Sequence, residues 1–383
     1  MTGRTPAWAK LWSFASLRYQ HTGWWLDRIL PHSPIGLLVV AVALPLAWFA
    51  VGYAITADRA AFLATPDVRG QLWFLPLHLI TLRVVGGLWG RGLVPSLDGL
   101  ALDPGAEARV KRGAFGVGAS LGALVAAAAF TARDFWYGLA VSPKSGLDAF
   151  DDPDLWDMAK LGRPVHGMML GVWTLEWLLF GYLLWLQLWV LIAWTRELRR
   201  ANFQASLMVV LVGDGYRHSF ALFGKTTSVC LMFALANLGF IAYTGELIPR
   251  DAVEISGVAD FLQNMSDVLS TTLLFVLALA AVITFVVQLR GGLSRAVNRE
   301  FAAAGNAALT DLATPMTLTG DAEADVVRLR ARVEAQSGLV RAIVLQREVD
   351  KVGGRTMIAG GAKALIPLVT TVLKIMKMQV KGG

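Results

Sequence analysis

Cysteine is almost absent from this chain, because its 383 residues include one, Cys230. A single thiol excludes an intramolecular disulfide framework and most thiolate metal sites. Charged residues are also scarce, at 16% of the chain, whereas 55% of the residues are hydrophobic and the mean hydropathy is +0.54. This composition does not fit an ordinary soluble domain and indicates a membrane protein.

The short motifs that mark common catalytic sites are missing as well. The sequence has no phosphate-binding G-x-x-x-x-G-K-[ST] loop, no H-E-x-x-H, no paired-cysteine motif and no G-x-S-x-G. The acidic run DAFDDPDLWD offers oxygen ligands but lacks the glycine and the distal glutamate of a calcium loop. Haem needs facing histidines, and only His78 lies well inside an apolar run, with His166 at the edge of another. We therefore expect no cofactor and no metal, and a membrane enzyme is the least favoured function class.

Long apolar runs are what the sequence does contain. A window of about twenty residues, the length that crosses ~30 Å of hydrocarbon, predicts six spans. They cover residues 34–56, 72–92, 114–132, 168–194, 226–247 and 268–289. The sequence thus predicts an all-α fold: a polytopic transmembrane helical bundle over 34–290, an N-terminal arm over 1–33 and a helical tail over 291–383. The first apolar run follows a polar, aromatic-rich arm and is long enough to remain as an anchor, so we expect no cleaved signal peptide.

Basic residues predict the orientation of the bundle. They gather in the N-terminal arm, after the second span, after the fourth span and at the start of the tail, whereas the alternate loops are acidic. Because basic loops are retained in the cytoplasm, an even number of spans places both termini there. The sequence therefore predicts a multi-pass protein of the inner membrane. The basic residues of the cytoplasmic loops also explain the net charge of +7, so we expect no nucleic-acid partner.

Small residues in the third span predict close helix packing. Ala114, Gly118, Gly122 and Ala126 recur at four-residue steps and would form a ridge buried in the bundle. The segment ASLMVVLVGDGYRHSF is too short in its apolar part to cross, so we expect an interfacial or re-entrant piece there.

The tail contains a segment with coiled-coil spacing. Within a helix predicted over 322–351, six residues recur at alternating steps of three and four: Val326, Leu329, Val333, Gln336, Val340 and Ile343. This seam fits an amphipathic helix packed on its own bundle, and it also fits a coiled coil between subunits. A homo-oligomer and a cytoplasmic protein partner are both compatible with it.

The last segment, 356–381, predicts a basic amphipathic helix. Its cations, Lys363, Lys374, Lys377 and Lys381, fall on one face, and apolar residues fill the other. Such a helix lies in the inner headgroup layer, attracted by anionic lipid headgroups. A helix docked on the protein and a seventh span are the alternatives.

Polar residues inside the spans are the main candidates for function. The set consists of His78, Arg83, Glu176, Gln187 and Asn237. A charge near mid-bilayer costs about 3 kcal/mol, so such residues face a partner or a wet cavity. Arg83 lies near the middle of the second span and Glu176 at a comparable depth in the fourth, which predicts an ion pair between them. Two functions remain open: a channel or transporter with a polar line inside the bundle, and a membrane-anchored signalling or assembly subunit that acts through its C-terminal helices.

Overall fold

The computed structural model describes residues 31, 33–141, 157–203, 206–213, 215–244, 266–313, 323–349 and 352. Its main helices are α3 (Pro34–Ile55), α4 (Arg59–Ala64), α5 (Pro66–Gly99), α6 (Ala106–Phe115), α7 (Val117–Val141), α8 (Arg163–Arg200), α9 (Tyr216–Thr244) and α11 (Ser266–Ala313). Two short helices, η2 (Asp157–Leu161) and η4 (Met208–Val212), and a helix over 323–349 complete the described part. No strand occurs within these ranges, so the all-α prediction is confirmed for them.

Six of the helical segments are long and apolar enough to cross a membrane, as the sequence predicted. The helices extend beyond most of the predicted spans, because polar turns continue the backbone hydrogen bonding past the apolar run. α5 has 34 residues, α8 has 38 and α11 has 48. Prolines at the first helical positions start α3 and α5, where a missing N–H costs nothing. Ser33 Oγ also accepts a hydrogen bond from Gly36 N at 3.0 Å, which caps α3.

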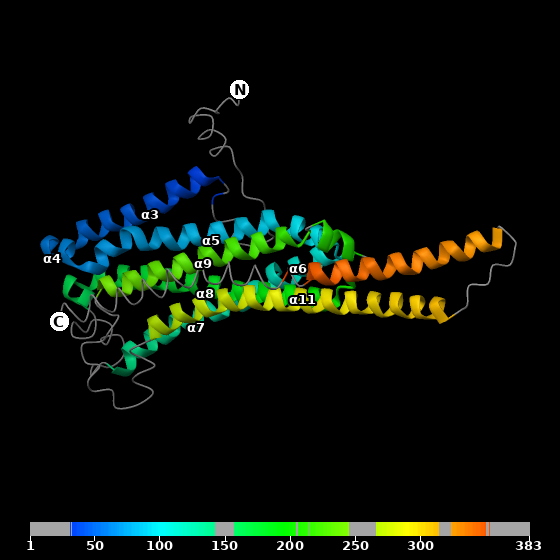
Figure 1. Ribbon diagram of the computed structural model, residues 1–383. Coiled ribbons are helices and arrows are strands. Elements are labelled where there is room, and N and C mark those ends of the chain that lie inside the picture. Colours follow the sequence, from blue (N-terminus) through cyan, green and yellow to red (C-terminus); the bar gives the residue numbers. More distant parts are fainter. Residues whose placement is uncertain are drawn as a thin grey trace, which may run out of the picture.

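The bundle is built around α5 and α8, which are the most buried of the six candidate spans. α5 packs most extensively against α9, while α8 packs against α7 and α11 (Figure 1). α3 covers α5 from one side, and its many exposed aliphatic side chains are suited to contact with lipid. This arrangement places the polar residues of α5, α8 and α9 in the interior.

The small-residue packing predicted for the third span is present in part. Ala119, Ala123 and Ala127 are buried, whereas Gly118 is exposed and has no atom within 4 Å of a built Cβ. Of the predicted ridge, Ala114 is buried and a Cβ on Gly122 would lie 2.7 Å from Trp185, so the prediction is wrong at Gly118. The physical reason is a break at Gly116, whose extended backbone (ψ 171°) separates α6 from α7 and changes the helical phase after Ala114.

The segment predicted to be interfacial or re-entrant contains η4, which is only 5 residues long and does not cross the bundle. Val210 and Leu211 are buried in the main core, whereas Met208, Val209 and Val212 are exposed. This one-sided burial lets the segment join α8 to α9 along one end of the bundle.

The two ends of the bundle differ. At the α6 end, the C-terminal ends of α5 and α8 meet the N-terminal end of α9, and Ser219 Oγ donates to Ser96 O at 3.1 Å. At the α4 end, Phe62, Val68 and Leu161 form a separate apolar cluster with the start of α8. The basic side chains of α6 and of the last turn of α8 lie at the α6 end.

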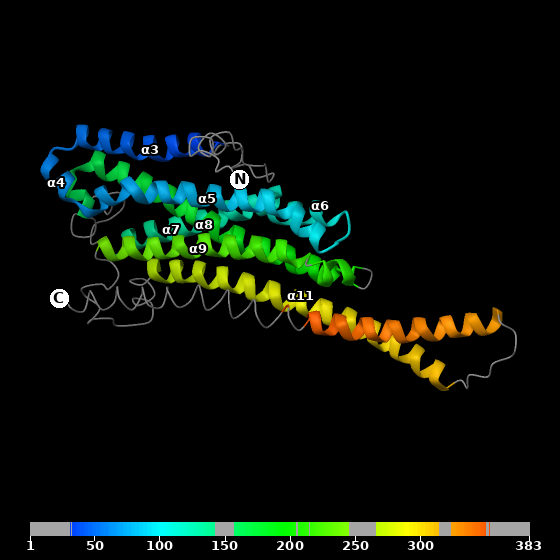
Figure 2. The same ribbon diagram turned by 45° about the horizontal axis from the view of Figure 1, so that its top comes forward.

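α11 does not stop near residue 290, where the sequence predicted a boundary between bundle and tail. It runs without interruption to Ala313, and the helix over 323–349 returns beside it. Residues 292–313 of α11 and the helix over 323–349 are called the C-terminal hairpin below. Figures 1 and 2 show the hairpin projecting past the other helices at the α6 end, in the direction of α11.

Candidate intramembrane polar site

All five polar residues predicted from the sequence are buried in the bundle. The exposed fractions of His78, Arg83, Glu176, Gln187 and Asn237 lie between 2% and 5%. His78 and Arg83 lie on α5, Glu176 and Gln187 on α8, and Asn237 on α9. Three helices of the core therefore contribute polar groups to the apolar interior.

A sixth buried polar residue, Gln71, belongs to the same set and was missed. Its Nε2 donates a hydrogen bond to Glu176 Oε2 at 3.1 Å, which joins α5 to α8. Gln71 is fully buried, one residue before the predicted start of the second span. The signal that would have found it is the true start of α5 at Pro66, which places Gln71 inside the helix.

The register between α5 and α8 decides which polar residues share a depth. Gln71 contacts Glu176, and the ring of Trp89 lies 6.4 Å from that of Trp194. Both pairs are separated by 105 residues (176 − 71 and 194 − 89), so the two helices run parallel in constant register. The same offset places Arg83 at the depth of Leu188, beside Gln187.

The predicted ion pair between Arg83 and Glu176 does not fit this register. Glu176 lies beside Gln71, twelve residues before Arg83, which corresponds to about 18 Å along α5. The prediction assumed that both helices start at one depth. With the offset of 105 residues, the start of α8 at Arg163 lies at the depth of position 58, which is eight residues before the start of α5 at Pro66. Counting the same number of residues from each helix start therefore does not give the same depth.

His78 and Asn237 share a level between these two pairs. α9 runs antiparallel to α5, with Phe240 stacked on Phe74 at 4.0 Å and Phe233 edge-on to His78 at 4.8 Å. Asn237 lies between Phe233 and Phe240 in the sequence, and therefore at the level of Phe74 and His78.

The hydrogen bond of His78 defines its neutral tautomer. Nδ1 lies 3.0 Å from the carbonyl oxygen of Phe74, and a carbonyl oxygen only accepts, so Nδ1 carries a proton. In the neutral ring Nε2 is then the acceptor. His78 can accept a second proton at that atom.

Several buried polar atoms of this set have no hydrogen-bond partner within the described ranges. They are Oε1 of Gln71, Oε1 of Glu176, Nε2 of Gln187 and Oδ1 of Asn237. We call the six side chains the polar line: Gln71 with Glu176, then Asn237 with His78, then Arg83 with Gln187. Each buried polar group without a hydrogen-bond partner costs about 1–3 kcal/mol of stability. Several such groups along one line are therefore unusual in a folded protein.

Aromatic rings close the polar line toward the α6 end. The rings of Trp89, Trp194, Phe223 and Phe285 form one cluster, in which Trp194 and Phe223 each contact the other three, with centroid distances between 4.3 and 6.4 Å. Trp89 is six residues past Arg83, or about 9 Å along α5. This aromatic layer separates the polar line from the basic end of the bundle.

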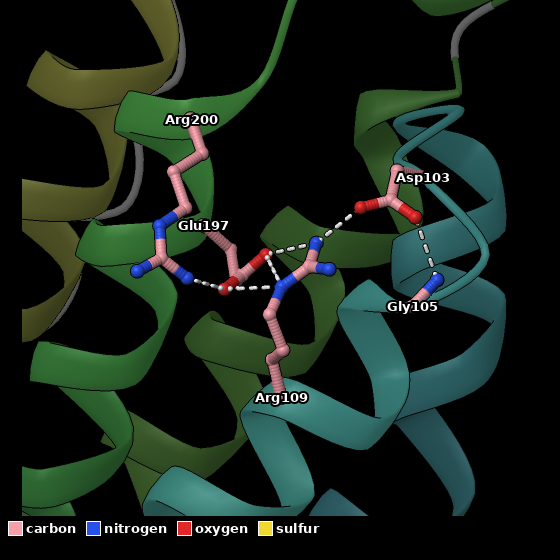
Figure 3. Close-up of polar contacts among 5 residues, drawn as sticks. All are labelled: Asp103, Gly105, Arg109, Glu197 and Arg200. Carbon is pink, nitrogen blue, oxygen red and sulfur yellow. Dashed lines mark hydrogen bonds and ion pairs between the residues drawn. The ribbon is translucent and has the colours of Figure 1, made fainter.

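A second polar cluster lies beyond that layer and was not predicted. Glu197, which is 4% exposed, accepts three hydrogen bonds from Arg109 at 2.8–3.0 Å and one from Arg200 Nη1 at 3.2 Å (Figure 3). Arg109 also donates to Asp103, so the cluster clamps α6 and the preceding loop onto α8. From the sequence these arginines are expected only to be basic loop residues, and no pattern indicates a role for Glu197.

The pKa of the Asp103 carboxyl lies below its usual value. The main cause is the hydrogen bond that Gly105 N donates to Oδ1 at 2.7 Å, and the next is the hydrogen bond from Arg109. Because both favour the ionised form, the contact is complete at neutral pH. It weakens when the pH falls through the lowered pKa.

The described ranges contain no group of three or more His, Cys, Asp or Glu side chains placed to hold a metal ion. The predicted membrane-surface lysines, Lys363, Lys374, Lys377 and Lys381, lie outside the described residues. Comparison with known proteins finds no matching family model, no matching curated protein and no matching solved structure.

Proposed function

We propose that the chain is an inner-membrane transport protein whose polar line carries protons, alone or coupled to a solute. The observation that carries this proposal is the line itself: six buried side chains with amide, imidazole, carboxyl or guanidinium groups, on the three core helices α5, α8 and α9. Buried carboxyl and imidazole groups in membrane helices are typical of proton relays.

The order of groups along the line supports proton movement. Glu176 and His78 can each take and release a proton, and they lie about 10 Å apart along the bundle, because Gln71 precedes His78 by seven residues. Asn237 lies at the level of His78, and its Oδ1 is an acceptor without a partner among the described residues. Water molecules bridging these atoms would satisfy their hydrogen bonds and complete a chain for proton transfer.

The aromatic layer supports a gated path over an open pore. The packed rings of Trp89, Trp194 and Phe223 lie between the line and the α6 end of the bundle. A hydrated ion would have to displace these rings, whereas a proton needs only brief contact with water.

Proton flux into liposomes tests the proposal. We expect the purified protein to acidify proteoliposomes under an imposed potential, and Glu176→Gln to lower that flux by roughly tenfold, because the amide cannot release a proton. Glu107→Gln is the matched control, since Glu107 lies on α6 and forms an exposed pair with Lys111. Flux no greater than in empty liposomes, or full flux in Glu176→Gln with an unchanged melting temperature, would refute the proposal.

The orientation is part of the proposal and is tested separately. We expect cysteines at positions 145 and 256 to react with an impermeant maleimide in intact cells, and cysteines at 201 and 322 to react only after lysis. The native Cys230 is fully buried, so it should contribute little background. Labelling of position 201 in intact cells would reverse the proposed topology.

A signalling or assembly subunit is the second candidate. It is favoured by the continuity of α11, which contacts α8 and α9 inside the bundle and forms one arm of the C-terminal hairpin. A shift of α11 within the bundle would therefore also move the C-terminal hairpin, because one helix runs through both. Loss of a binding partner on deletion of the hairpin, in a protein without proton flux, would favour this function.

A further inference from the structure

The helix over 323–349 has two apolar faces, and the described chain covers only one. The covered face packs on α11: a Cβ on Gly338 would contact Ala304 Cβ at 3.7 Å, and Arg341 Nε lies 3.2 Å from Glu300 Oε1. Nearer the bundle, Leu345 and Val349 are fully buried in the core. These contacts fix an antiparallel hairpin through one side of the helix.

The other face is exposed and has the heptad spacing noted in the sequence. Val326, Leu329, Val333, Val340 and Ile343 are exposed by 42–63%, with Gln336 at the one polar position among them. If Val326 is position a of the heptad, these residues are its a and d positions, and the buried Leu345 is at position f. The seam therefore lies opposite to the face that packs on α11.

The geometry of a membrane protein restricts how a second copy can approach this seam. Two copies in one bilayer share their orientation and are related by an axis along the membrane normal. The hairpin continues the direction of α11 away from the bundle, so the helices of two copies would run parallel (Figure 2).

The charges flanking the seam fit that parallel pairing. In parallel coiled coils, a g residue meets the e residue five positions later on the partner helix. The first such pair is Asp325 with Arg330, which is attractive, and a later one is Leu339 with Val344, which is apolar. Arg330 is 80% exposed, and its pairing with Glu334 within the helix leaves it accessible.

We infer that the seam of residues 326–343 docks a second copy of this chain in a parallel coiled coil. One polar residue in an otherwise apolar seam disfavours pairings in which it would face an apolar side chain, and the parallel, in-register pair places Gln336 opposite Gln336 of the second copy. The inference does not depend on the proposed transport function, because it concerns a surface outside the bundle.

Disulfide cross-linking in membranes tests the inference with adjacent, equally exposed valines. In a Cys230→Ser background, we expect Val326→Cys to give a covalent dimer under mild oxidation, because a positions of a parallel pair approach within disulfide distance. Val327 is 63% exposed against 62% for Val326, but it points away from the seam. Val327→Cys should therefore give roughly fivefold less dimer.

Light scattering in detergent provides an independent measurement. Val333→Glu should reduce the mass to that of one chain without changing the melting temperature of the bundle, whereas Val327→Glu should keep the larger mass. Equal cross-linking at positions 326 and 327 would indicate random collision and overturn the inference. So would a monomeric wild-type protein, or the absence of a Val326→Cys dimer, as expected for an antiparallel pair or for a seam covered by another segment of the chain.

Discussion

Replacing Glu197 by glutamine should lower the unfolding free energy by about 2 kcal/mol, because a carboxylate that accepts several charged hydrogen bonds loses its charge. Glu197 is nearly fully buried and is the shared acceptor of Arg109 and Arg200. The amide of the substituted side chain would direct N–H donors at the guanidinium of Arg109. In a chain of this size the loss corresponds to a melting temperature lower by about 2.5 °C, measured in detergent.

The control for this substitution is Glu107→Gln on α6. Glu107 and Lys111 form a half-exposed pair one helical turn apart, and such pairs contribute about 0.5 kcal/mol or less. Glu107→Gln should thus leave the melting temperature nearly unchanged. If both substitutions cost the same, the cluster around Glu197 is an ordinary surface ion pair and does not clamp α6 to α8.

The membrane fold was predictable because hydrocarbon imposes a simple requirement on sequence. Each crossing needs about twenty apolar residues, and backbone hydrogen bonds must close within the helix. Six such runs could therefore be found without any knowledge of packing. The ends of the helices were not predictable in this way, because polar turns continue α5, α8 and α11 beyond the apolar runs.

The members of the polar line were predictable, but their partners were not. A polar side chain within an apolar run stands out in the sequence, and five of the six were identified for that reason. Depth relative to another helix depends on the helix–helix register, which no local pattern contains. Glu176 therefore lies beside Gln71, although Arg83 was the partner predicted for it.

The cluster around Glu197 could not be predicted from the sequence for a different reason. Arg109 and Arg200 were interpreted as loop charges, which is the usual role of basic residues near the ends of spans. Their second role depends on α6 folding back onto the end of α8, 88 residues later in the sequence. A contact of that range is determined by the tertiary fold alone.

Replacing Gly99 by alanine should be among the most damaging small substitutions in the chain, with a loss of about 3 kcal/mol in unfolding free energy. Gly99 ends α5 and faces Gly215, which precedes α9. A Cβ on Gly99 would overlap the carbonyl oxygen of Gly215, and a Cβ on Gly215 would overlap the carbonyl oxygen of Gly99. Because both obstacles are backbone atoms, neither can rotate away, and α5 and α9 would have to separate.

Two other glycines provide a graded comparison by thermal unfolding in detergent. Gly92→Ala would bring a Cβ within 2.6 Å of Leu222 Cδ1, the end of a flexible side chain, so its cost should be smaller, at about 1 kcal/mol. Gly118→Ala meets nothing within 4 Å, and it should be neutral or slightly stabilising, because alanine favours the helix by about 1 kcal/mol. If Gly99→Ala proved as harmless as Gly118→Ala, α5 and α9 would not touch at this end. The register that places Asn237 at the level of His78 would then lose one of its contacts, and the order of groups along the polar line would have to be measured again.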